Sequence, residues 1–133
     1  MRRLPRVRGV LAVVGGATLL LAGCSSAQQP DVEQVAAAFE DTSGDPEARC
    51  DLLAPATLAA FEESESAPCA DALQRLPLQA AEVASVEIWG GNAQVRMGED
   101  TLFLAETRAG WRVVAAACTP RGEAPYDCEV EGP

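Results

Sequence analysis

Lysine and histidine are absent from this chain of 133 residues, and isoleucine and asparagine occur once each, as Ile88 and Asn92. Without histidine there is no Ser-His or Cys-His nucleophile, and without lysine no Schiff base can form. Lysine, isoleucine and asparagine share AT-rich codons, so their scarcity also indicates a GC-rich bacterial genome. Only carboxylates, Tyr126 and hydroxyls are left for acid–base chemistry, and we expect a protein that is not an enzyme.

Positive charge is scarce beyond the N-terminus. Ten arginines stand against 20 acidic residues, which gives a net charge of −10. Arg2, Arg3, Arg6 and Arg8 all precede the first acid, Asp31, so removal of the N-terminus leaves six arginines and a side-chain charge of −14. A domain with this charge repels nucleic acids and anionic lipid, and we expect no nucleic-acid partner.

The N-terminus has the layout of a secretory signal. Residues 1–8 are basic, and residues 10–22 form an uncharged apolar run. As a helix this run spans only about 20 Å, which is short of the roughly 30 Å hydrocarbon core of a bilayer. The pattern therefore predicts an export signal and not a stable membrane span.

The motif Leu21-Ala22-Gly23-Cys24 resembles the bacterial lipoprotein box, a leucine and two small residues before a cysteine. In that class the cysteine carries diacylglycerol and palmitate, and it becomes the N-terminus after cleavage. The resemblance implies a signal peptide over residues 1–23, a lipidated Cys24 with a polar tether over residues 24–30, and anchoring at the extracytoplasmic face of the cell membrane. Two or three acyl chains anchor stably, whereas one alone is marginal. The alternative is a chance cysteine after an ordinary signal peptide, and the pair Arg2-Arg3 leaves Sec or twin-arginine export open.

Four further cysteines, Cys50, Cys69, Cys118 and Cys128, are an even number in an exported domain and indicate disulfides. Three pairings are possible, and the short loops favour Cys50–Cys69 with Cys118–Cys128. A zinc site or a redox pair is the alternative, but the chain has no C-x-x-C spacing and no histidine. We expect no metal and no cofactor.

Residues 31–133 are expected to form one α+β domain, with N-terminal helices packed on a curved four-stranded antiparallel sheet. Asp31 predicts the N-cap of a first helix, and Asp45-Pro46, Pro55 and Pro68 predict the starts of three more. The apolar face of the first helix carries Val32, Val35, Ala36 and Phe39.

Alternation and turn signals after residue 80 predict strands at 83–89, 93–97, 101–108 and 111–118. The third of these is apolar on both faces, which indicates cover on both sides, a cavity wall or a dimer surface. Residues 119–133 contain three prolines and two glycines and are expected to form a loop that Cys128 ties back.

The cysteine pairs and their neighbours resemble small exported lipoproteins of actinobacteria, which are similar to the NTF2-like (cystatin-like) superfamily. The resemblance implies a curved sheet wrapped on helices, no defined activity and no catalytic residues. It also leads us to expect glycine where Ala117 precedes Cys118. The matching segments are Cys50-Asp51-Leu52-Leu53-Ala54-Pro55-Ala56-Thr57, Pro68-Cys69, Gly110-Trp111-Arg112-Val113-Val114-Ala115-Ala116-Ala117-Cys118 and Pro125-Tyr126-Asp127-Cys128.

Trp89 is a candidate contact residue because it shares strand parity with Ser85 and Glu87, away from the apolar face. On a regular strand this places the indole in solvent, where it is suited to contact a partner or ligand. We favour the alternative that a bulge at the following glycines turns Trp89 inward. Trp111 is expected in the core.

Arg96 and Arg112 are the other candidate contacts, since both fall opposite the expected core face and suit an anion or an acidic partner. We favour the alternative that they form a cross-strand ion-pair ladder with Glu87 and Glu106. Such exposed pairs add little stability.

The pattern as a whole predicts a lipid-anchored envelope lipoprotein that is a non-enzymatic interaction or accessory module with an envelope protein partner. The alternative is a small-molecule-binding domain with its ligand in the concave face of the sheet. A packed concave face with an apolar outer patch at Trp89 favours the first interpretation, and a sizeable pocket there favours the second.

Overall fold

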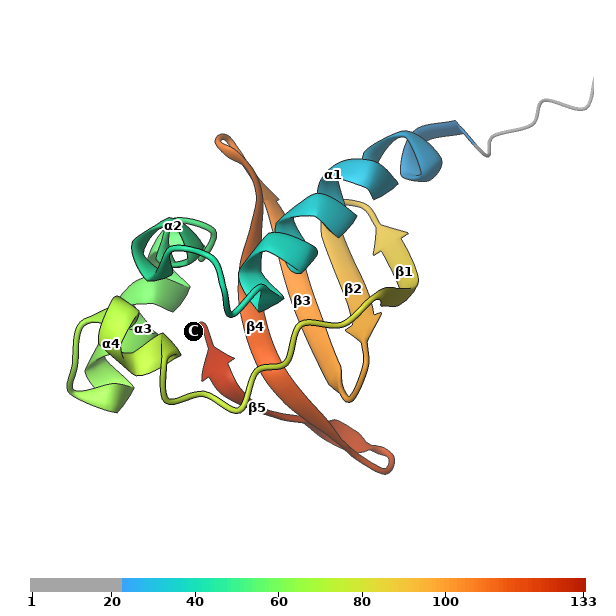
Figure 1. The fold of residues 1–133 in the computed structure, drawn as a ribbon. Coiled ribbons are helices and arrows are strands. Elements are labelled where there is room, and N and C mark those ends of the chain that lie inside the picture. Colours follow the sequence, from blue (N-terminus) through green and yellow to red (C-terminus); the bar gives the residue numbers. More distant parts are fainter. Residues whose placement is uncertain (1–22) are drawn as a thin grey trace, which may run out of the picture.

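The computed structural model describes the backbone of residues 23–133 and the side chains from Ala27 onward, Ala124 excepted. Residues 1–22, which hold most of the expected signal peptide, and the side chain of Cys24 lie outside the described residues. Within this range the chain is an α+β domain, as predicted, with four helices followed by an antiparallel sheet (Figure 1). The helices are α1 (Gly23–Glu40), α2 (Pro46–Cys50), α3 (Pro55–Glu65) and α4 (Cys69–Leu73).

The sheet has five strands and not the expected four. They are β1 (Val83–Trp89), β2 (Asn92–Met97), β3 (Asp100–Thr107), β4 (Gly110–Arg121) and β5 (Ala124–Glu131), and each pairs only with its neighbours in the chain. β5 occupies the segment that was predicted to be a loop. Proline is tolerated on an edge strand, because its missing N–H can face away from the ladder, so Pro125 does not end the pairing of β5 with β4.

α1 lies diagonally across one face of the sheet (Figure 1). Val32, Ala36 and Phe39 recur at helical spacing, and all three are fully buried against the sheet residues Val95, Leu102, Leu104, Trp111 and Val113. The helix begins at Gly23, eight residues before the predicted cap at Asp31, and it passes through Pro30. Residues 24–30, which were expected as a tether, are therefore helical.

α2, α3 and α4 form a group beside β4 and β5 (Figure 1). Asp45 is the N-cap of α2, as predicted, and its carboxylate accepts the backbone N–H of Ala48 at 3.0 Å. The connection from α2 to α3 also covers part of the edge of β4. The N–H of Val113 donates to the carbonyl of Leu52 at 2.8 Å, and its carbonyl accepts the N–H of Ala54 at 2.9 Å.

The two disulfides pair as predicted, Cys50 with Cys69 and Cys118 with Cys128. The first joins α2 to α4, and the second joins facing residues of β4 and β5. Each therefore fixes an element that is short or lies at the edge of the sheet.

Replacement of Cys50 and Cys69 together by alanine is expected to lower the free energy of unfolding by about 3 kcal/mol, because the bond closes a loop of 19 residues in the unfolded chain. The loop of 10 residues between Cys118 and Cys128 predicts a slightly smaller loss for the matching double variant. Urea unfolding of the oxidised proteins measures both losses. An unchanged midpoint in the first variant would contradict this role of the Cys50–Cys69 bond.

Candidate functional site

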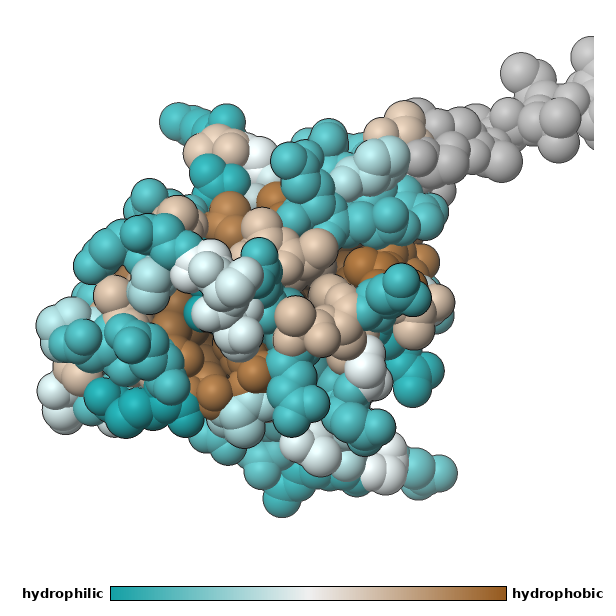
Figure 2. Space-filling view, viewed as in Figure 1, coloured by the Kyte–Doolittle hydropathy of each residue, from teal (hydrophilic) through white to brown (hydrophobic). Residues whose placement is uncertain are grey.

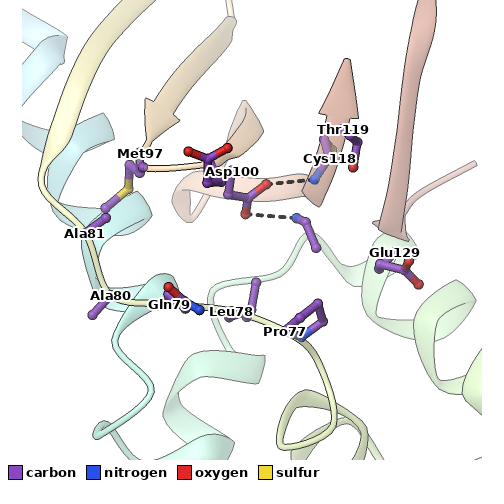
Figure 3. Close-up of a pocket in the computed structure, with 13 residues that line it drawn as sticks. Pro77, Leu78, Gln79, Ala80, Ala81, Met97, Asp100, Cys118, Thr119 and Glu129 are labelled. Atoms are coloured by element: carbon purple, nitrogen blue, oxygen red, sulfur yellow. Dashed lines mark hydrogen bonds between the residues drawn. The ribbon is translucent and has the colours of Figure 1, made fainter. Parts of the chain in front are cut away.

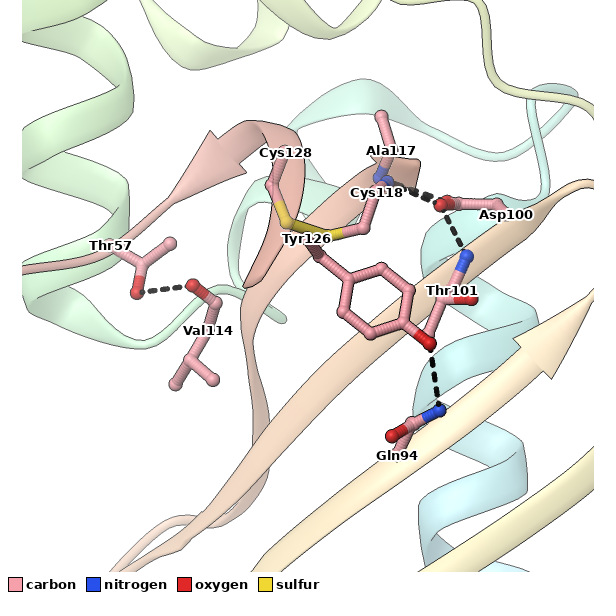
Figure 4. The surroundings of a disulfide bond; sticks show 9 residues. All are labelled: Thr57, Gln94, Asp100, Thr101, Val114, Ala117, Cys118, Tyr126 and Cys128. Atoms are coloured by element: carbon pink, nitrogen blue, oxygen red, sulfur yellow. Dashed lines mark hydrogen bonds between the residues drawn. A yellow bond between two sulfur atoms is a disulfide. The ribbon is translucent and has the colours of Figure 1, made fainter. Parts of the chain in front are cut away.

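A polar cluster of three backbone hydrogen bonds surrounds Asp100, the first residue of β3. One oxygen of its carboxylate accepts the N–H groups of Thr101 at 2.6 Å and Cys118 at 2.7 Å, and the other accepts the N–H of Ala117 at 2.9 Å (Figure 4). Hydrogen bonds to an ionised acceptor are shorter and stronger than neutral ones. Asp100 thus ties the start of β3 to β4 beside the Cys118–Cys128 disulfide.

Ala117 adopts a left-handed backbone conformation, with φ of 52°. This turns two successive N–H groups, those of Ala117 and Cys118, toward one carboxylate and makes a small anion-binding nest. Glycine adopts this conformation without steric penalty, whereas alanine does so at some cost. Position 117 is the one at which the family resemblance led us to expect glycine.

Glu40, the last residue of α1, is buried beside this cluster with 1% of its surface exposed. Neither oxygen of its carboxyl group accepts a hydrogen bond from a protein donor. The pKa of Glu40 is raised to about 8, first by burial and then by a hydrogen bond to Asp100 and the negative charge of Asp100, while the charge of Arg49 lowers it. Burial and the neighbouring charge of Asp100 both favour the neutral form of Glu40, and in that form its hydroxyl can donate to the Asp100 carboxylate.

Arg49 completes the buried cluster from α2. Its Nε donates to the carbonyl of Phe39 at 2.7 Å, and its guanidinium lies 5.7 Å from the centre of the Phe39 ring. Burial lowers the pKa of Arg49, and this is partly offset by the charge of Asp41 and by Glu40 in its ionised form. Because Glu40 and Arg49 are both closed off from solvent, the cluster is suited to hold elements together and not to meet a substrate.

A cavity of about 320 Å³ lies next to Asp100, under the connection from α4 to β1 (Figure 3). Its apolar side is formed by Leu78, Met97 and their neighbours, and its polar residues are Gln79, Thr119 and the acids Glu99, Asp100 and Glu129. It has no arginine in its wall. The Asp100 oxygens already accept backbone N–H groups, so the cavity offers no unused buried polar atom to a ligand.

Trp89 is the exposed large hydrophobic residue of the described chain, with 49% of its surface in solvent. The bulge that we favoured is wrong: β1 pairs regularly with β2 through Trp89 and Asn92, and its irregularity lies between Val83 and Ser85. Trp111 is buried, as predicted.

Arg96 and Arg112 do not form the expected ladder. Within residues 23–133 the ion pair found joins Arg75 to Glu65, at 3.4 Å. The register explains this, because Arg96 faces Ser85 and Thr101, and Glu106 faces Trp111. Arg112 instead donates to the carbonyl of Trp111 at 2.8 Å. It lines, with Arg108 and Asp51, a shallow hollow of about 450 Å³ between α2, α3 and the β3–β4 turn.

On the second apolar face of β3, Tyr126 of β5 partly covers Phe103. The rings of Phe103 and Tyr126 meet edge to face, with centres 5.1 Å apart. Tyr126 reaches Gln94 of β2, whose amide donates to its hydroxyl at 3.4 Å (Figure 4). Phe103 thus has partial cover on its second side and stays half-buried.

No family model, no curated protein and no solved structure matches this chain. In the described residues, no three acidic or cysteine side chains converge as a metal site needs. None of the helices described is long and apolar enough to cross a membrane.

Proposed function

We propose that this protein is a lipid-anchored lipoprotein of the cell envelope, held at the extracytoplasmic face of the membrane through Cys24. The lipoprotein box and the apolar run before it support this proposal. The two disulfides add to it, because such bonds persist in oxidising compartments outside the cytoplasm.

The folded domain, in this proposal, is a non-enzymatic interaction module. The main support for an interaction role is that the sheet face under α1 is packed with buried side chains, while Trp89 is exposed on the opposite face. A ligand in the face under α1 would have to displace Val32, Ala36 or Phe39, all fully buried there. A large exposed indole is the residue type that dominates many contact surfaces.

Mass spectrometry of the protein extracted from membranes tests the anchor. We expect an N-terminal peptide that starts at Cys24 and carries a diacylglycerol group, and we expect Cys24→Ala to leave the membrane fraction. An unmodified Cys24, or a retained segment 1–23, would exclude the anchor.

A photoreactive residue at position 89, introduced in the producing cells, tests the contact surface. We expect crosslinks from position 89 and not from exposed Glu123, which lies in the turn at the other end of the sheet. Equal yields from both positions, or no product from either, would contradict a contact role for this surface.

A further inference from the structure

The exposed Trp89 lies at the same end of the domain as the start of α1. Gln28 of α1 donates to the Glu106 side chain at 3.4 Å, and the N–H of Glu106 donates to the carbonyl of Gly91 at 2.8 Å. The turn that follows Trp89 is therefore level with Gln28. Cys24 is four residues earlier in α1, about 6 Å further along the helix axis.

This geometry brings the indole within reach of the surface that an acylated Cys24 would enter. Figure 1 shows the first turns of α1 projecting past the end of β1, in the direction away from the sheet. A tryptophan side chain and one helical turn are of similar length, and the headgroup region of one leaflet is several ångströms thick. A helix that starts at the anchor holds the domain closer to the membrane than an extended tether would.

Apolar surface at this end is not limited to Trp89. Val86 and Ile88 of β1 are only half-buried, on the face opposite to the indole. In Figure 2, which views the α1 side of the domain, a brown patch lies over β1, with teal residues above it and tan residues beside it. Tryptophan is enriched at membrane–water interfaces, where the ring lies among the headgroups and the indole N–H remains hydrogen-bonded to water or headgroups.

The charges of the turns also distinguish the two ends of the sheet. In an antiparallel meander successive turns alternate between the two ends of the sheet. Turn 90–91 has no charge, and turn 108–109 at the same end carries Arg108, whereas turns 98–99 and 122–123 at the other end carry Glu99 and Glu123. Glu106 also lies at the Trp89 end, since its N–H donates to the carbonyl of Gly91, and Arg121 precedes the turn that carries Glu123, so the Trp89 end is the less acidic of the two by a small margin. An anionic membrane surface repels the acidic end and leaves the Trp89 end toward the lipid.

We propose that the domain docks on the bilayer by this end, with Trp89 inserted among the lipid headgroups, so that the membrane itself is the partner of the exposed indole. This inference rests on the proposed lipid anchor at Cys24. It makes the acid-rich end, with the turns at Glu99 and Glu123, the surface that points away from the membrane.

Tryptophan fluorescence tests the docking, because the chain has two tryptophans and only Trp89 is exposed. The full lipidated protein and its Trp89→Phe variant are placed in vesicles of phosphatidylethanolamine and phosphatidylglycerol, with and without lipids brominated near the headgroup. The difference between the two proteins gives the emission of Trp89 while the core residue Trp111 stays intact. We expect a blue shift and about a two-fold loss of Trp89 emission to the brominated lipid, as for an indole at the interface.

A tryptophan at the opposite end is the matched control. Glu123→Trp in the Trp89→Phe background should show no quenching by brominated lipid and full quenching by aqueous iodide. If the protein floats with the vesicles but Trp89 is open to iodide and untouched by bromine, the docking is wrong and the anchor stands. If the protein does not float with the vesicles, both the anchor and the docking fail.

Discussion

Asp100→Ala is expected to give the largest loss of stability of any single substitution considered for this domain, about 4 kcal/mol or more. The substitution removes the acceptor of three backbone N–H groups, those of Thr101, Ala117 and Cys118. A hydrogen bond to a charged group contributes about 1.5–3 kcal/mol, and a buried donor left without a partner is penalised further. Because small domains have only about 5–15 kcal/mol in total, the variant should be close to unfolded at physiological temperature.

Urea unfolding at neutral pH measures this loss, with two comparisons. Asp100→Asn keeps the shape of the side chain but replaces one accepting oxygen by an NH₂ group, which faces backbone N–H donors. It should therefore recover only part of the stability. Asp127→Ala removes an exposed carboxylate from β5 and should change stability by less than about 0.5 kcal/mol. A loss for Asp100→Ala no larger than that for Asp127→Ala would show that the N–H groups find other partners.

Glu40→Gln is expected to remove a pH dependence of stability that the native protein shows between about pH 4.5 and 8. The folded pKa of Glu40 is about 8 against 4.5 for a free side chain, so the unfolded chain releases this proton first as the pH rises. Stability due to Glu40 is therefore complete below pH 4.5 and is lost as the pH rises through 8. Each pH unit inside the window corresponds to at most about 1.4 kcal/mol, and a total of a few kcal/mol is expected.

The measurement is the difference in unfolding free energy between the variant and the native protein at several pH values, since other carboxylates contribute equally to both. Glutamine carries no charge at any of these pH values, and it can donate to Asp100 as neutral Glu40 does. Glu40→Gln should therefore match the native protein near pH 4.5 and exceed it near pH 8. Glu123→Gln, an exposed control, should follow the native curve throughout. A constant difference across the range would mean that Glu40 is not protonated in the fold.

Local patterns were enough to predict most of the elements. Proline and aspartate at helix starts, and alternation between turn glycines, gave α2, α3, α4 and the first four strands with boundaries close to those observed. β5 was missed because the prolines and glycines of residues 119–133 suggest a loop, whereas the edge position that tolerates Pro125 depends on where β4 lies.

The candidate contacts depended on register. Trp89 is exposed as its parity indicates, since β1 runs without a bulge up to the turn. The arginine ladder failed because cross-strand partners are set by turn length, and a shift of one position exchanges every neighbour. The roles of Asp100 and Glu40 had no local signal, because the partners of Asp100 are 17 and 18 residues away in the sequence, and Glu40 lies 60 positions before it.

The sequence alone predicted the α+β class and favoured the disulfide pairing that the structure has, because these depend on short-range patterns and on cysteine spacing. The anchor at Cys24 stays a prediction from the sequence. Only the tertiary structure decided that a carboxyl group with a raised pKa is buried at the end of α1, that Ala117 adopts a left-handed conformation to face Asp100, and that Trp89 is exposed at the end of the sheet where α1 starts. Each of these results from segments far apart in the chain that meet at one place, where burial and neighbouring charge change the properties of the side chains.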